Sequence, residues 1–409
     1  MLNKNSEREL AYVVLIDGIE SIPGYDRVEQ AIVGGWRIIV QKGQFSIGDP
    51  AIYFEIDSKV PSDRECFAFL EKRSYKVKTL KMCKTISQGL LMHAKDFGWT
   101  TCEMESDTGE IRGIVDANGN THYPIDESRF LTKELGVTYA DAEDNARKAP
   151  SVDKYKKMAQ RHPNIFKKPW ARWLMKRPWG RKLMFVFFGK KKDKKNGWPA
   201  WVEKTDEERV QNMPWILKDE GTWIATEKID GSSTTFTMRR GKRGKKEFYV
   251  CSRNVCFDSV EKPCYYDTNI YWEMAKKYNM YEVLSILLDK FPKEEWITIQ
   301  GETYGEGVQK RDYTCTCHEF AAFNLIMSTT GRWNSEKMRK LLTIYKIPTV
   351  PLLGTLNINQ FANVDEILAY AEGSSVIDAL PREGIVFRSE DGTKSFKAVS
   401  NNFLLKYHG

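Results

Sequence analysis

One lysine stands where its neighbours could turn it into a nucleophile. The chain runs Glu227-Lys228-Ile229-Asp230-Gly231-Ser232 directly after an apolar run over residues 223–226, so we expect Lys228 at the end of a strand. The ordinary pKa of a lysine side chain is about 10.4, so the amine is protonated at neutral pH. A lysine forms covalent intermediates once this proton is lost, and charged groups nearby must promote that loss. A Lys-x-Asp-Gly match alone is common by chance, and its plain alternative is a solvated surface turn.

Further residues able to do chemistry follow Lys228 along the chain. Two acids, Glu302 and Glu383, each border a strand-like apolar run, and Lys397 comes late in the sequence. Each has an ordinary explanation when taken alone: a loop carboxylate, a solvated edge lysine or, for Phe323, a core aromatic. Their occurrence together is hard to attribute to chance. The segments are Ser252-Arg253-Asn254, Ile299-Gln300-Gly301-Glu302, Phe320-Ala321-Ala322-Phe323-Asn324, Arg382-Glu383-Gly384-Ile385-Val386 and Ser395-Phe396-Lys397.

This ordered set resembles the covalent nucleotidyltransferases, which include ATP-dependent RNA and DNA ligases and mRNA capping guanylyltransferases. The motifs are most similar to those of RNA ligases, in particular a branch in which an OB domain precedes the catalytic domain. The likeness covers roughly residues 8–95 and 200–409, and it includes an element at residues 204–212. The sequence ends twelve residues after Lys397, which leaves no room for the C-terminal barrel of DNA ligases and capping enzymes and so favours an RNA ligase.

The resemblance implies an ATP-dependent RNA ligase that joins 3′-OH and 5′-phosphate ends through a lysine–AMP adduct and then an AMP-capped polynucleotide. Lys228 would be the nucleophile, Lys397 would clamp phosphate, and three acids would hold Mg²⁺ or Mn²⁺ through its hydration shell: Asp230, Glu302 and Glu383. Adenine would stack on Phe323. The expected nucleotide-binding set is Glu227, Lys228, Arg253, Glu302, Phe323, Lys397 and Arg209.

Several alternatives stay open. Arg209 is equally well explained as an ordinary partner on a helix capped by Thr205. A capping-type guanylyltransferase and a non-catalytic nucleic-acid-binding protein share the same implied fold. The expected partner is RNA, as a nicked duplex or a broken strand, with DNA on one side of the break left open. We expect a monomer.

The remaining pattern predicts an α+β protein. Five alternating runs within residues 10–93, separated by turn signals such as Pro23-Gly24, suggest an OB-like β-barrel at residues 1–100. A short helix is expected after Thr132, and a hairpin around Asn118-Gly119. Mixed strands and helices over residues 201–409 fit the implied ATP-grasp-like nucleotidyltransferase domain of antiparallel sheets and helices. Residues 101–200 are expected to form an insertion and linker.

Charge is concentrated in this linker. Residues 154–195 hold 16 Lys or Arg and one acid, a net of +15, while the rest of the 409-residue chain carries −7. Tryptophans at 170, 173, 179 and 198 are interleaved with these bases. A basic track with stacking platforms suits a nucleic acid, although a solvated linker with packed tryptophans is the plain alternative.

The composition also indicates where in the cell the protein is expected. No run of 18 apolar residues predicts a membrane span, and the N-terminus lacks the apolar stretch of a secretory signal. Eight cysteines without a Cys-x-x-Cys pair indicate reduced thiols, so we expect an intracellular and cytoplasmic protein with no membrane partner. Cys315-Thr316-Cys317-His318 has the wrong spacing for a zinc half-site, and zinc is not expected there.

Overall fold

The computed structural model describes residues 1–5, 7–106, 109–140, 198–257 and 268–408, with the single positions Lys168, Ala171, Trp173, Leu174, Arg177, Met184, Cys264 and Tyr266. The chain divides into two compact units, of which the first comprises Met1–Tyr139 and Trp198–Gly409 and the second Ala140–Gly197. Within the described part of the chain, no helix has the length and apolar character needed to cross a membrane. Apart from single positions, the basic segment lies outside the described residues.

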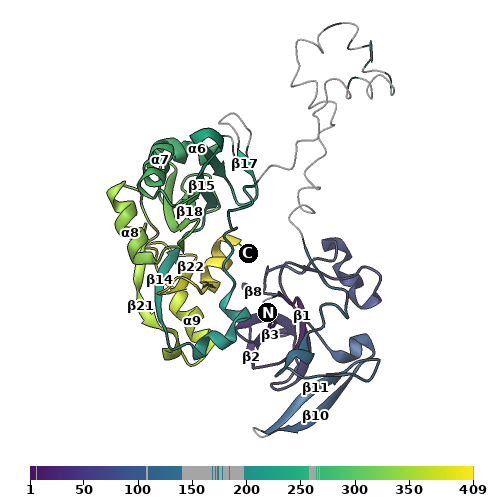
Figure 1. Ribbon diagram of the computed structural model, residues 1–409. Helices are drawn as coiled ribbons and strands as arrows, with labels where there is room; N and C mark the ends of the chain where they lie inside the picture. The colour runs from purple at the N-terminus through teal and green to yellow at the C-terminus, as the bar shows by residue number, and fades with distance from the viewer. Residues whose placement is uncertain are drawn as a thin grey trace. The chain divides into compact units, whose positions relative to one another are not determined.

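The N-terminal strands pair mainly in two three-stranded antiparallel sheets (Figure 1). One has the order β1-β5-β9 and the other β2-β3-β4. The predicted run over residues 31–42 is two strands, because Gly34 and Gly35, with φ of 52° and 82°, form the two-residue turn between them. The bounds are β1 Ala11–Leu15, β2 Gly18–Ser21, β3 Val28–Val33, β4 Trp36–Gln41, β5 Pro50–Phe54 and β9 Leu90–Met92.

These sheets do not form the closed barrel that was expected. Among the described residues no strand ladder joins the two sheets, although Gln88 N donates to the Arg37 carbonyl at 2.7 Å beside β4. Two further two-stranded sheets form in this domain. One pairs β7 with β8, and the other pairs β6 with the later strand β13. Their bounds are β6 Ser58–Lys59, β7 Leu80–Met82, β8 Thr85–Ser87 and β13 Thr138–Tyr139.

The N-terminal core extends beyond the expected boundary at residue 100. Strands β10 (Thr100–Ser106), β11 (Gly109–Val115) and β12 (Thr121–His122) form an antiparallel sheet, which confirms the hairpin predicted around Asn118-Gly119. Ile114 and Leu135 are fully buried in the same cluster as Val13. The helix predicted after Thr132 was wrong: residues 132–136 form a hydrogen-bonded turn that leads directly into β13.

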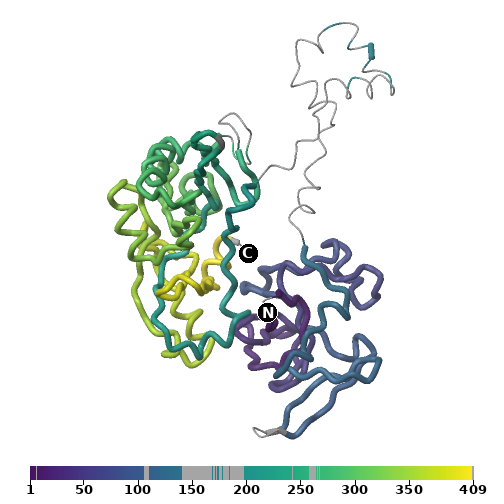
Figure 2. The backbone as a smooth tube through the Cα atoms, in the orientation of Figure 1, coloured from purple at the N-terminus to yellow at the C-terminus, as the bar shows by residue number. Residues whose placement is uncertain are grey.

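Two antiparallel sheets make up the C-terminal domain, and the chain crosses from the first to the second and returns (Figure 2). The first has the order β21-β14-β22-β23, and the second has the order β17-β16-β15-β18-β19-β20. The first contains β14 Thr222–Lys228, β21 Leu352–Asn357, β22 Gly384–Ser389 and β23 Ser395–Val399. The second contains β15 Ser232–Arg240, β16 Lys246–Cys251, β17 Cys256–Phe257, β18 Trp296–Tyr304, β19 Glu319–Met327 and β20 Gly331–Arg332.

Helices cover these sheets. Residues 270–290 form two helices, because Asn279 adopts the left-handed conformation (φ 48°) between them. Both contact the six-stranded sheet, while α9 packs with β23 of the four-stranded sheet. Asn363 caps α9 by accepting from Glu366 N at 3.0 Å. The bounds are α6 Ile270–Lys277, α7 Met280–Lys290, α8 Ser335–Ile344, α9 Val364–Ala371 and α10 Asn401–Phe403.

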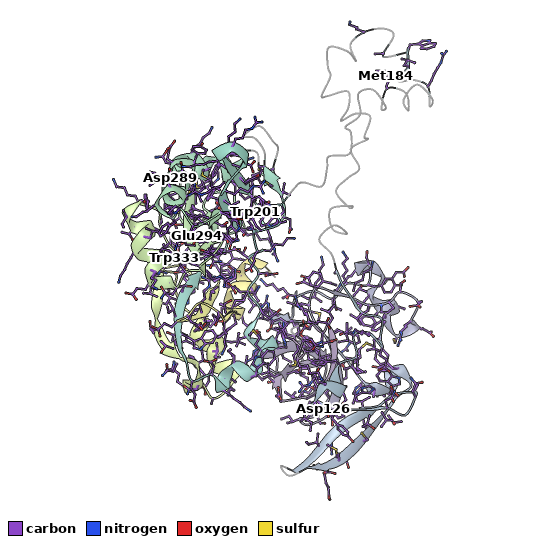
Figure 3. The ribbon with its side chains drawn as sticks, viewed as in Figure 1. Asp126, Met184, Trp201, Asp289, Glu294 and Trp333 are labelled. Carbon is purple, nitrogen blue, oxygen red and sulfur yellow. The ribbon has the colours of Figure 1, made fainter. Side chains whose placement is uncertain are left out.

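Short helical turns complete the described structure. The 3₁₀ segments are η1 Glu65–Arg73, η2 Ala94–Phe97, η3 Glu127–Arg129, η4 Val210–Asn212, η5 Pro214–Lys218, η6 Lys242–Gly244 and η7 Ile358–Gln360, followed by the π-helical η8 Leu404–His408. Glu294, labelled in Figure 3, accepts from Ser328 Oγ and Thr329 N at 2.8 and 2.7 Å. It thereby ties the start of β18 to the turn after β19.

Candidate active site

The connection from β14 to β15 joins the two C-terminal sheets. Lys228 is the last residue of β14, and after three intervening residues Ser232 begins β15 in the other sheet. Gly231 is required there, because a Cβ at this position would lie 2.4 Å from the Thr303 carbonyl oxygen. The crossing therefore places Lys228 at the junction of two rigid sheets. A cavity of about 350 Å³ opens at this junction.

Strand alternation directs the first sheet's residues into the cavity. Lys228 pairs with Gly384, Thr226 with Val386, and Val386 in turn with Lys397. Side chains two residues apart on a strand share a face, so Lys228, Thr226 and Lys397 point the same way, and all three line the cavity. The opposite face carries Ile385, which is fully buried against α9.

Lys228 is held by a carboxylate. Its Nζ donates to Glu383 Oε2 at 2.7 Å, and the side chains are 25% and 13% exposed. Burial acts to lower the pKa of Lys228, but the Glu383 and Glu302 carboxylates outweigh it and raise that pKa above its ordinary value. The acids beside Lys228 therefore favour its ammonium form in this structure.

Glu302, on β18, completes a group of three acids with Asp230 and Glu383. Burial, opposed by Lys228 and reinforced by the other two acids, raises the pKa of Glu302 to about 8. Asp230 is held through its backbone, whose N–H donates to the Tyr313 hydroxyl at 2.6 Å. Three carboxylates that repel one another in a partly buried cavity match the oxygen donors that Mg²⁺ and Mn²⁺ prefer.

Two cations share one carboxylate on the other side of the cavity. Lys397 Nζ donates to Asp206 Oδ1 at 3.2 Å, and Arg253 Nη2 donates to Asp206 Oδ2 at 2.6 Å. Burial, with Lys228 and Arg209 nearby, lowers the pKa of Lys397 despite the Asp206 charge. Lys397 and Arg253 thus form a site for an anion, and in this structure the carboxylate of Asp206 is the anion that they bind.

Phe323 lines the cavity from β19 and is fixed by Arg388 of β22. Arg388 Nη1 donates to the Phe323 carbonyl at 2.8 Å, and its guanidinium carbon lies 5.5 Å from the ring centroid. Arg388 Nη2 also donates to Glu207 at 2.8 Å. Arg388 thus links the two sheets beside the cavity. Glu227 also lines the cavity, and its carboxylate accepts from Ser375 Oγ and Val376 N.

Of the predicted residues, all except Arg209 line the cavity. Arg209 precedes the short η4 turn, so the predicted helix capped by Thr205 does not form. Its guanidinium lies 5.6 Å from the Trp36 ring centroid, and its Nη1 is buried without a hydrogen-bond partner. Its backbone bridges to Lys397, which keeps it next to the cavity.

Sequence reasoning missed Asp206, Tyr313 and Arg388. Asp206 lies in the upstream element that the resemblance had already marked, so its proximity to Lys397 could have been expected. Arg388 lies two residues after Val386 on the same strand face, which the alternation rule would have found. Tyr313 had no signal, because it lies in a loop between β18 and β19 and reaches Asp230 only through the fold.

Comparisons with known proteins agree with this geometry. The RNA ligase family model matches residues 221–408, and an OB-fold domain model matches residues 10–94. A search of curated proteins gives no match. Structures of Naegleria gruberi RNA ligase, as variants with AMP and Mn and with ATP and Mn, are 24% identical with a TM-score of 0.64 and cover 98% of this chain and 99% of theirs. A structure of the same ligase with PPi has a TM-score of 0.62.

Likeness at this identity establishes the fold, and it confirms the predicted α+β architecture with an N-terminal OB fold. The family match spans both sheets that surround the cavity. The C-terminal domain of this chain is therefore similar to the RNA ligase family over residues 221–408, and a segment that matches an OB-fold domain model precedes it.

Proposed function

We propose that this protein is an ATP-dependent RNA ligase that joins 3′-OH and 5′-phosphate ends through an adenylate on Lys228. The observation that carries the proposal is the convergence of Lys228, Asp230, Glu302, Glu383 and Lys397 on one cavity. The family match and the Naegleria gruberi structures with ATP, AMP and Mn support it.

In the first step, neutral Lys228 Nζ attacks the α-phosphorus of ATP. A nitrogen–phosphorus bond forms, the bond between the α-phosphorus and the bridging oxygen breaks, and pyrophosphate leaves with the electron pair. AMP then passes from Lys228 to the 5′-phosphate of the RNA. Attack by the 3′-OH on that phosphate forms the phosphodiester and releases AMP. Splitting the joining reaction in this way replaces one difficult step with easier ones.

Glu383 is the group in reach of the lysine proton. Its Oε2 lies 2.7 Å from Nζ, so it is positioned to accept the proton as Lys228 becomes a nucleophile. The same carboxylate favours the ammonium before ATP binds, because its negative charge raises the pKa of Lys228. Lys228 therefore becomes a nucleophile more readily when positive charge bound nearby offsets the negative charge of Glu383.

Asp230, Glu302 and Glu383 offer carboxylates to a divalent cation, and they would hold Mg²⁺ or Mn²⁺ through its water. When bound, such an ion supplies positive charge that offsets the acids and the phosphate oxygens. Burial first, and then the like charges of Glu383 and Asp230, raise the pKa of Glu302 at this place.

Lys397 and Arg253 would bind phosphate. Both donate to Asp206, and phosphate oxygens accept the same hydrogen bonds that its carboxylate accepts here. We therefore propose that ATP displaces Asp206 as their partner. Phe323 offers an apolar ring for the adenine, held in place by Arg388. Glu227 and Arg209 stay as proposed nucleotide-binding residues, and RNA as the partner.

Incubation with α-labelled ATP and Mg²⁺ or Mn²⁺ tests the proposal. We expect label on the wild-type protein at the Lys228 peptide, no label with Lys228→Ala, and no label from α-labelled GTP. Exposed Lys340, which pairs with Glu336 on α8, offers a matched control, and Lys340→Ala should label like wild type. Absence of adduct from folded wild-type protein would refute the proposal.

Sealing assays then define the substrate. Nicked duplexes with RNA or DNA on each side of the break, all carrying a 3′-OH and a 5′-phosphate, show which sides accept DNA, and wild-type protein should join the duplex whose broken strand is RNA on both sides. A protein that forms the adduct but seals none of them would not be a ligase of these ends.

A further inference from the structure

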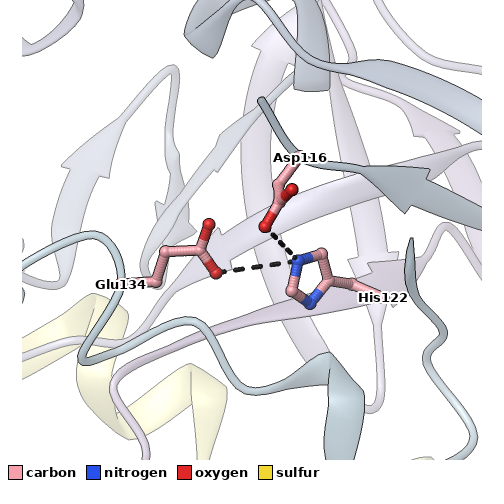
Figure 4. Close-up of side chains that lie close together, drawn as sticks. All are labelled: Asp116, His122 and Glu134. Carbon is pink, nitrogen blue, oxygen red and sulfur yellow. Dashed lines mark hydrogen bonds and ion pairs between the residues drawn. The ribbon is translucent and has the colours of Figure 1, made fainter. Parts of the chain in front are cut away.

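Three metal-ligating side chains converge in the N-terminal domain, in a cluster separate from the cavity residues described above (Figure 4). Asp116 follows β11, His122 ends β12, and Glu134 lies in the turn before β13. His122 Nε2 lies 3.2 Å from Asp116 Oδ2 and 3.6 Å from Glu134 Oε2. One ligand atom from each residue lies within 4.8 Å of the others.

The imidazole orientation singles this cluster out from an ordinary group of acids. His122 Nδ1 lies 2.7 Å from the backbone carbonyl of Ser128, and a carbonyl can only accept a hydrogen bond. Nδ1 therefore carries the proton, and in the neutral ring Nε2 directs a lone pair toward two carboxylate oxygens. Lone pairs that face one another repel, so something positive has to lie among them: a second ring proton, a proton shared by the Asp116 and Glu134 carboxylates, or a metal ion.

The spacing suits a metal ion. Two ligands bonded at about 2.0–2.2 Å to one ion, at tetrahedral or octahedral angles, lie roughly 3.0–3.6 Å apart. The two measured separations from Nε2 fall at 3.2 and 3.6 Å. A ring held through Nδ1 by a backbone carbonyl, with Nε2 free to coordinate, is the outer-sphere arrangement that metal-binding histidines adopt.

Neighbouring groups hold Asp116 and His122 in place, and Glu134 is accessible to solvent. The Asp116 side chain is fully buried and accepts from Asn118 N, Asn120 N and Asn120 Nδ2, each at 2.8 Å. The Trp99 ring stacks on His122, with centroids 6.1 Å apart and planes at 17°. Glu134 is 31% exposed, which leaves a route for an ion and a position for water.

We propose that Asp116, His122 and Glu134 bind one Zn²⁺ with water as a further ligand. An imidazole and two carboxylates are ligands that Zn²⁺ accepts, whereas Mg²⁺ takes oxygen ligands. The site ties the β11–β12 hairpin to the turn before β13, so its role is to stabilise the N-terminal domain. An ion that binds only the folded state raises its stability by mass action.

Zinc uptake by the full chain tests the proposal. The protein is stripped with a chelator, desalted and equilibrated with Zn²⁺, and bound zinc and melting temperature are measured for wild type, Glu134→Gln and the exposed control Glu65→Gln. We expect wild type and the control to hold one zinc more than Glu134→Gln, which keeps all active-site acids. At free zinc about 100-fold above Kd, their melting temperature should rise by about 5 °C or more.

A second measurement works on wild type alone, in case the variant folds poorly. Addition of Zn²⁺ should shift the Nε2 resonance of His122 in a spectrum of ¹⁵N-labelled imidazoles and leave Nδ1 protonated. Co²⁺ at the same site should give a visible absorption band that Zn²⁺ abolishes. Equal zinc content in wild type and Glu134→Gln, or an unchanged His122 spectrum, would show an imidazolium paired with carboxylates and would overturn the proposal.

Discussion

Replacement of Glu383 by glutamine should lower the pKa of Lys228. The two side chains form an ion pair at 2.7 Å, and the Glu383 charge is the largest contribution that raises this pKa. One opposite charge at this range changes a pKa by about 1–3 units. Because the Lys228 side chain is 25% exposed and Glu302 stays in place, we expect a decrease of about 1–2 units, or about 1.4–3 kcal/mol.

Competitive labelling with an amine-reactive reagent over a pH series measures this shift without requiring catalysis. The midpoint for the peptide that contains Lys228 should move to lower pH in Glu383→Gln. Glu336→Gln, which removes the acid of an exposed pair on α8, should leave the midpoint unchanged. If the Lys228 midpoint stays in place or rises in Glu383→Gln, the electrostatic account of the site is wrong.

Three further outcomes follow from contacts at the site. The pKa of Glu302 is about 8 in the folded protein against an ordinary 4.5, so folding takes up a proton at this residue. The free energy of unfolding therefore declines as the pH rises between these two values. Thermal melts should show that the stability of Glu302→Gln relative to wild type increases by about 1–3 kcal/mol between pH 5 and pH 9. Tyr313→Phe removes the acceptor for Asp230 N and should slow adenylylation about 10-fold in a labelling time course, with melting temperature little changed. Arg388→Lys loses the planar fork that holds Phe323, so the KM for ATP should rise several-fold in initial-rate assays, and an unchanged KM would contradict the positioning role.

Half of the ten strands that the structure describes in the C-terminal domain could be predicted from local pattern. Residues 320–327 are apolar apart from Asn324 and are numerous enough for a strand, and β19 spans them with one residue more. Strand β15 was not predicted, because its Ser and Thr residues look like a loop, yet Thr234 and Thr235 are buried. The Thr234 hydroxyl pairs with that of Thr303, and both residues pair with β18, so tertiary contacts, rather than hydrophobic period, determine this strand.

The candidate site was found through residue order, which identifies its members but not their ionisation. No local pattern indicates that Glu383 pairs with Lys228, since 155 residues separate them and the contact depends on β14–β22 register. The pKa directions of Lys228 and Glu302 follow from that pairing and from burial, so they required the structure. The His122 cluster was missed for the same reason: its ligands are scattered over a hairpin and a turn.

The three-residue link between β14 and β15 restricts how this protein can diverge. Side chains alternate with a period of two, so one inserted residue after Lys228 would exchange the inner and outer faces of the next strand, or force a bulge at its start. The buried Phe236 and Met238 would then turn toward the opposite face. An insertion that displaced the Lys228 amine would therefore also unfold the domain. Natural and laboratory variants should keep the length of this three-residue link, even in proteins that no longer catalyse the reaction.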